Sequence, residues 1–171
     1  MQVNDYAWQV TAEGDLIILL LQMARFLIKS LEAARRGEEV TGLVASLAPL
    51  KDPGFRIESA APRRATTMEP LCDPAYLESL FRYRALVSIV AAGDELEAHR
   101  KLGLDADQAW NAAGLGLVNA AKAHCNYFML SKFNEQIAAS GGAVAAALRR
   151  LSALLALANI IDGSQWQGIL S

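Results

Sequence analysis

Cysteine and aromatic residues are scarce in this sequence. It has two cysteines, Cys72 and Cys125, which are too few for a disulfide framework and fit a reducing compartment. Aromatic residues make up 7% of the chain, alanine and leucine dominate, and no stretch alternates between apolar and polar residues as a strand would. We therefore predict an all-α fold, a helical bundle.

The sequence also lacks a large charge imbalance. Its 171 residues carry a formal net charge of −2, which gives no electrostatic reason to expect a nucleic-acid partner. The most apolar run, Leu16 to Leu21, is soon interrupted by Gln22, Arg25 and Lys29, so it is too short for a bilayer-spanning helix of about 20 apolar residues. We expect a soluble chain with no signal peptide and no membrane span.

Common site motifs are missing as well. The sequence contains no glycine-rich phosphate loop, no serine-nucleophile motif and no CxxC pair. His124 and Cys125 are adjacent, so on a helix they point about 100° apart and cannot share a zinc ion. We predict no metal site, and we expect His124 to be a histidine whose hydrogen bonds are satisfied within the bundle.

Proline divides the chain. All five prolines fall between residues 49 and 74, and a structureless connection of that length is uncommon inside a compact domain. We therefore predict three segments: residues 1–50 with a turn and a long buried helix, a proline-rich connection at 51–72, and a second group of helices at 73–171. Arg63 and Arg64 in the connection offer charge to a phosphate group, although paired loop arginines are usually just solvated.

Helical periodicity predicts the first long helix. It should start near Leu16, be buried on every side as far as Leu21, continue with a single apolar stripe, and stop at Gly37. The spacing of Glu32 and Arg36 predicts an ion pair on its exposed face, which also carries Arg25 and Lys29.

Three further long helices are expected, starting at Pro74, near Asp105 and after Gly142. Proline is favourable at a first helical position because its missing N–H would be unbonded there anyway. Gly114 and Gly116 fall inside the second of these helices. We expect both to permit close approach of a neighbouring helix rather than to break the helix.

The turn Glu13-Gly14-Asp15 precedes the first helix. Asp15 is suited to accept hydrogen bonds from the first backbone N–H groups, and Gly14 lets the chain turn sharply ahead of it. A carboxylate placed like Glu13 can act as a base. A solvated turn residue is the commoner role for such a glutamate, and the residues alone leave both interpretations open.

This turn, taken with residues 19–29, LLLQMARFLIK, resembles the acyl-CoA oxidase family. The resemblance implies that Glu13 is the general base that removes the α-proton of a fatty acyl-CoA while the β-hydrogen leaves as hydride to FAD, with O₂ as the oxidant. It also implies that the backbone N–H of Glu13 donates to the thioester carbonyl, and that Gly14 and Asp15 lie near the flavin. Ala12 and Leu16-Ile17 depart from the family, which usually has an aromatic residue and polar residues there.

A second stretch carries the same resemblance. Ala109-Trp110-Asn111 and Ala123-His124-Cys125, with Tyr127 following, are similar to the packing residues of the C-terminal helical domain of acyl-CoA oxidases. Family members are several times longer, and their main FAD and acyl-CoA segments precede the turn. The resemblance therefore implies that this chain is a C-terminal part, that it binds no FAD alone, and that it forms a homodimer.

Two hypotheses follow for function. In the first, the chain is the base-bearing C-terminal fragment of a flavin-dependent acyl-CoA oxidase, inactive by itself. In the second, it is a non-catalytic helical packing or dimerisation module of that family. A peroxisomal location is implied by the resemblance alone, because the ending Gln167 to Ser171 is no Ser-Lys-Leu-type signal. In either case we expect exposed apolar surface and self-association.

Overall fold

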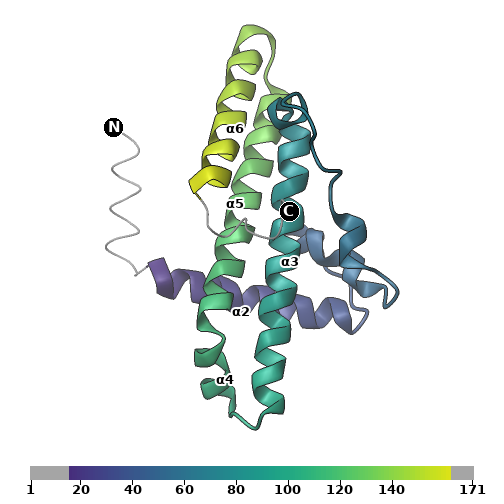
Figure 1. Cartoon of the computed structure of the whole chain (residues 1–171), viewed down its shortest axis with the longest axis vertical. Helices are drawn as coiled ribbons and strands as arrows, with labels where there is room; N and C mark the ends of the chain where they lie inside the picture. Colours follow the sequence, from purple (N-terminus) through teal and green to yellow (C-terminus); the bar gives the residue numbers. More distant parts are fainter. Residues whose placement is uncertain (1–15, 163–171) are drawn as a thin grey trace. The chain divides into compact units, whose positions relative to one another are not determined.

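The structure is a computed structural model that describes residues 16–162 (Figure 1). Its ordered elements are all helical, and no strand occurs between residues 16 and 162, so the predicted all-α class is confirmed. The elements are α2 (Leu16–Arg35), η1 (Gly42–Lys51), η2 (Ile57–Ala60), η3 (Pro70–Cys72), α3 (Pro74–Lys101), α4 (Ala106–Ala112), α5 (Gly114–Ala139) and α6 (Gly142–Asp162).

The chain forms two compact units that alternate along the sequence. Unit 1 combines the described residues up to Asp52 with Ser88–Lys122, and unit 2 combines Pro53–Val87 with the described residues from Ala123 onward. The long helices α3 and α5 therefore each contribute residues to both units. The three-segment division suggested by the prolines stays a prediction.

Helix α2 supplies the central stripe of the core of unit 1. Ala24, Leu27, Ile28 and Leu31 are buried, and their i, i+3, i+4, i+7 spacing places them on one face, as predicted. The helix ends at Arg35, and Gly37 follows with φ of +83°, a left-handed conformation that glycine adopts without strain.

The first turns of α2 differ from the prediction. Leu16 and Ile18 are each 56% exposed, and of the run Leu16 to Leu21 only Leu20 is buried. Burial on every side is therefore not achieved within this chain, whereas the expected exposed apolar surface is present. The observed contacts of α2 with α3 involve later residues such as Leu31, and the early turns leave an apolar surface uncovered, as the expectation of self-association requires.

Two glycines set the close approach of helices in unit 1. A Cβ atom at Gly93 of α3 would overlap the Leu31 side chain of α2, and one at Gly116 of α5 would overlap the Glu95 carboxylate of α3. A Cβ atom at Gly114 would meet nothing within 4 Å. The expectation of close approach is thus right for Gly116 and wrong for Gly114, where α5 begins after a break from α4.

Ion pairs in unit 1 also differ from the local expectation. Glu32 pairs across helices with Arg100 of α3 at 3.5 Å, and Arg36 pairs with Glu38 at 2.6 Å, so the predicted Glu32–Arg36 pair does not form. The local pair is lost because Arg36 lies just beyond the end of α2, where its side chain pairs with Glu38 instead. Arg35 joins α2 to α3 through Asp94 at 2.6 Å.

Unit 2 has a separate apolar core with a polar network beside it. Ser152 of α6, which is fully buried, donates a hydrogen bond to Oδ1 of Asn134 at 2.8 Å. The amide of Asn134 donates in turn to Glu78 at 2.9 Å and to the carbonyl of Pro74 at 3.2 Å, which links α5 to α3. The buried apolar residues of this core are Leu77, Leu80, Phe81, Leu130, Ala153 and Ala156.

One helix, α6, is unusually apolar. Its segment Gly142–Ile161 is the only one among residues 16–162 that is long and apolar enough to cross a membrane by length and composition. Core helices of soluble proteins meet the same criterion, so a single such helix is weak evidence for a span. Arg149 and Arg150 lie near its middle, where a charge costs about 2.5–3.5 kcal/mol in a bilayer. These charges disfavour a membrane span.

Candidate functional site

The predicted site residues Glu13, Gly14 and Asp15 lie outside the described residues. The nearest described element is α2, whose first residue, Leu16, follows Asp15 directly. The early turns of α2 carry exposed apolar side chains, and one face of the helix lines a pocket. This pocket is therefore the described region closest in sequence to the proposed base.

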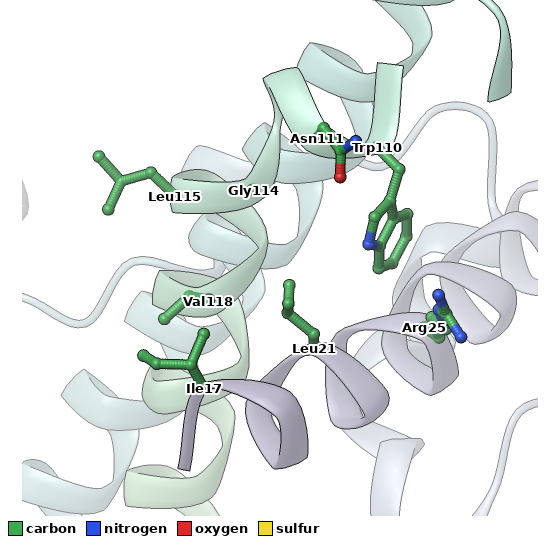
Figure 2. A pocket seen from close by; sticks show the side chains of 8 residues that line it. All are labelled: Ile17, Leu21, Arg25, Trp110, Asn111, Gly114, Leu115 and Val118. Carbon is green, nitrogen blue, oxygen red and sulfur yellow. The ribbon is translucent and has the colours of Figure 1, made fainter. Parts of the chain in front are cut away.

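The pocket, here called the α2–α5 pocket, has a volume of about 580 Å³ and belongs entirely to unit 1. Helix α2 contributes Ile17, Leu21 and Arg25, which lie on one face because they are four residues apart. Its other lining residues are Trp110 and Asn111 of α4 and Gly114, Leu115 and Val118 of α5 (Figure 2).

The α2–α5 pocket is polar at one end and apolar at the other. The Arg25 guanidinium lies over the Trp110 ring, 5.4 Å from its centroid, which is a cation–π arrangement. Figure 2 shows Ile17 and Val118 together at the opposite end, with Leu21 between the two ends. Among the described residues that line the pocket, Arg25 is the only charged one. The pocket can therefore accept an apolar group that ends in one negative charge.

Sequence reasoning misses this pocket. Helical periodicity places Arg25 on the solvent-facing side of its helix, and the family resemblance gives Trp110 a packing role. The spacing of Ile17, Leu21 and Arg25 is a signal for a shared face on α2. No local pattern, however, pairs that face with residues of α4 and α5.

His124 is buried, but its expected hydrogen bonding is incomplete. It is 2% exposed, its ring meets the Tyr127 ring edge-on at 6.5 Å between centroids, and its Nδ1 has no hydrogen-bond partner among the described residues. The expectation of a fully satisfied histidine is therefore wrong. Burial lowers the pKa of His124 and raises the pKa of the neighbouring Cys125 thiol, so both groups are held neutral.

Metal binding finds no support in the described part of the chain. Between residues 16 and 162 there is no group of three or more His, Cys, Asp or Glu side chains that could hold an ion.

The loop of Arg63, one of two arginines considered for phosphate, is held by Tyr76. The Tyr76 hydroxyl donates to the carbonyl of Arg63 at 2.9 Å and accepts a hydrogen bond from the backbone N–H of Ala65 at 3.0 Å. Tyr76 thus fixes the backbone of this loop.

The buried neutral His124 predicts a pH-dependent stability. Its pKa is depressed in the folded state, so below about pH 6.5 the unfolded state binds the proton more readily and the free energy of unfolding falls. Above that pH the contribution of His124 to stability is complete. The slope can reach about 1.4 kcal/mol per pH unit for one proton.

Urea unfolding of the His124→Gln variant between pH 5 and 8 checks this prediction. The variant should lose the slope, while the control His99→Gln keeps it because His124 is intact. An unchanged slope in His124→Gln would show that other groups cause the acid sensitivity.

Comparisons with known proteins agree on one family. The family model described as "Acyl-CoA oxidase" matches residues 73–166, more than half of the chain. Peroxisomal acyl-coenzyme A oxidase 1 of Bos taurus is 35% identical over 154 residues, which cover 88% of this chain and 23% of that protein. The peroxisomal acyl-coenzyme A oxidase 1 of Homo sapiens gives the same identity and coverage.

A solved structure shows the same fold. The crystal structure of acyl-coA oxidase3 from Yarrowia lipolytica superimposes with a TM-score of 0.80 at 28% identity, covering 97% of this chain and 23% of that one. The chain therefore spans about a quarter of the length of the relatives it matches. Since the family model covers more than half of the sequence and the helical fold agrees, this chain belongs to the acyl-CoA oxidase family.

Proposed function

We propose that this chain forms the C-terminal, base-bearing part of a flavin-dependent acyl-CoA oxidase, which converts a fatty acyl-CoA and O₂ to a trans-2-enoyl-CoA and hydrogen peroxide. One observation carries the proposal most directly: the Glu13 turn stands immediately before α2, in a chain whose family is established. The names of the relatives support a peroxisomal location.

Glu13 has the central role in the proposed reaction. Its carboxylate takes the proton from the α-carbon of the thioester, and the electrons of that C–H bond form the new double bond as hydride leaves the β-carbon. The backbone N–H of Glu13 donates to the thioester oxygen, where negative charge develops. When bound, FAD would supply the hydride acceptor, and O₂ would serve as the final two-electron oxidant, giving hydrogen peroxide with two protons.

The described residues nearest the proposed flavin region offer it few polar contacts. Leu16, Ile17, Ile18 and Leu19 have apolar side chains and are exposed, so they give van der Waals contact and no side-chain hydrogen bond. Gly14 and Asp15 stay proposed flavin neighbours. We therefore assign the main FAD contacts to other parts of a longer enzyme, and we expect the isolated chain to bind no FAD.

The proposal is tested in a chimera in which this chain replaces the matching quarter of the Bos taurus relative. We expect the chimera to bind FAD and to form hydrogen peroxide when acyl-CoA is added, as measured with a peroxidase-coupled dye. The unmodified bovine enzyme, prepared in parallel, is the control. A folded chimera that binds FAD and acyl-CoA but forms no hydrogen peroxide would contradict the proposal.

That contradicting result would favour a second candidate, a non-catalytic packing or homodimerisation module. The observation behind it is the apolar surface of α6, where Val144, Leu151, Leu154 and Leu155 are each more than half exposed. Surfaces of this kind mark protein contacts in soluble proteins. Sedimentation of the isolated chain at tens of micromolar measures this tendency, since a clean monomer would contradict the module.

A further inference from the structure

The charge and shape of the α2–α5 pocket point to a ligand of a definite kind. We propose that this pocket binds a medium-chain carboxylate, with the carboxylate on Arg25 and the alkyl chain running along Leu21 toward Ile17 and Val118. The proposal goes beyond the oxidase function, because it needs neither Glu13 nor FAD. It concerns a free acid, which has no thioester to react.

The Arg25 guanidinium is the proposed partner of the carboxylate head group. Within residues 16–162 no carboxylate forms an ion pair with this exposed side chain, although Arg35, Arg36 and Arg100 of the same unit are all paired. The Arg25 guanidinium carbon lies 5.4 Å from the centroid of the Trp110 ring. A guanidinium beside a ring still presents its N–H groups at its edge, and these match the two oxygens of a carboxylate.

The apolar part of the lining is the proposed contact surface of the alkyl tail. Ile17, Leu21, Leu115 and Val118 supply aliphatic surface, and Figure 2 shows Leu21 lying between the Arg25 end and the Ile17 end. Apolar walls with a few placed polar groups are typical of small-molecule sites, and about 580 Å³ falls within their usual size range. Each methylene that the pocket buries should raise affinity roughly fourfold.

The number of charges selects the free acid over a CoA thioester. The described residues of the lining include one cation, which balances one carboxylate. A CoA thioester lacks that carboxylate and carries several phosphate charges, for which these residues provide no further cation. We therefore expect decanoate to bind more tightly than decanoyl-CoA.

Trp110 provides a built-in probe for binding. The chain has three tryptophans, so replacing Trp8 and Trp166 by Phe leaves Trp110 as the only one. Decanoate, titrated below the concentration at which it forms micelles, should change the Trp110 emission in a saturable way. Calorimetry should give one site per chain, and octanoate should bind roughly fifteenfold more weakly than decanoate. A signal that never saturates would overturn the proposal.

A pair of glycine variants tests the location of the site. Gly114 lines the pocket, and a Cβ atom there would meet nothing within 4 Å, so the Cβ atom of Gly114→Leu has room and the added side chain takes up pocket space. Gly141, between α5 and α6, has the same open surroundings and lies outside the pocket, which makes Gly141→Leu the matched control. Gly114→Leu should weaken decanoate binding at least tenfold, and Gly141→Leu should not. Equal binding in both variants would overturn the proposal.

The role of Arg25 is tested by changing both partners. Arg25→Gln should weaken decanoate about tenfold or more, whereas Arg25→Lys, which keeps the charge, should lose less. Decanol has the same tail without the charge, so the Arg25→Gln variant should bind it nearly as well as the parent chain does. If Arg25→Gln weakened decanol as much as decanoate, Arg25 would be a structural residue and the assignment would fail. Tighter binding of decanoyl-CoA than of decanoate would also contradict it.

Discussion

Flavin reduction by acyl-CoA should slow by about 10²–10⁴-fold when Glu13 is replaced by Gln in the chimera with the bovine relative. Glutamine keeps the size and hydrogen-bonding reach of the side chain but cannot take the α-proton. FAD and acyl-CoA binding should persist, because the backbone N–H at this position is unchanged. Anaerobic stopped flow, which follows the visible flavin band, isolates this step from the reaction with O₂.

A matched control is available on the same chain. Glu39 is exposed and lies after the end of α2, so Glu39→Gln removes a carboxylate without touching the proposed base and should leave the rate unchanged. If Glu13→Gln reduced its flavin at the parental rate, the base would lie elsewhere. Loss of FAD binding in Glu13→Gln would instead assign Glu13 a structural role at the start of α2.

Leu31→Ala should lower the free energy of unfolding by about 2–5 kcal/mol. Leu31 is 1% exposed and fills the space beside Gly93, so truncation leaves a cavity at the contact between α2 and α3. Gly93→Ala alone should also destabilise, by about 1–3 kcal/mol, because its new methyl group would overlap the Leu31 side chain. Urea unfolding measures both changes.

The double variant distinguishes this geometry from a general loss of packing. With Leu31 truncated, the methyl group of Gly93→Ala enters the space left behind, and alanine favours the helix by up to about 1 kcal/mol. The second change should therefore be neutral or stabilising in that background, which is strong non-additivity. Gly114→Ala, in open space, is the control and should not depend on Leu31. Additive costs for Leu31→Ala and Gly93→Ala would refute the contact.

The features of the fold that depend on residues close together in the sequence could be predicted. The buried stripe through Leu27 and Leu31 follows from helical spacing, and the end of α2 follows from Gly37, which has a positive φ. The predicted start of α3 at Pro74 is also confirmed. These features are fixed by backbone geometry within a few residues.

Features that depend on distant residues could not be predicted. The ion pair of Glu32 with Arg100 replaces a local one because α3 lies across α2 there, and Gly116 faces Glu95 of α3 whereas Gly114 faces open space. The candidate site divides in the same way. Glu13 is identified through resemblance, whereas Arg25 and Trp110 meet only through folding.

The alternation of the two units along the sequence has a consequence for synthesis on the ribosome. Synthesis of unit 1 is complete once Lys122 has been added. Phe81 of unit 2, in contrast, cannot complete its apolar core until Ala156, one of its partners there, has been synthesised. At 5–20 residues per second, that wait is roughly 4–15 s. During this time Phe81 and its neighbours are exposed in the nascent chain, and this is the interval in which a chaperone would be needed most.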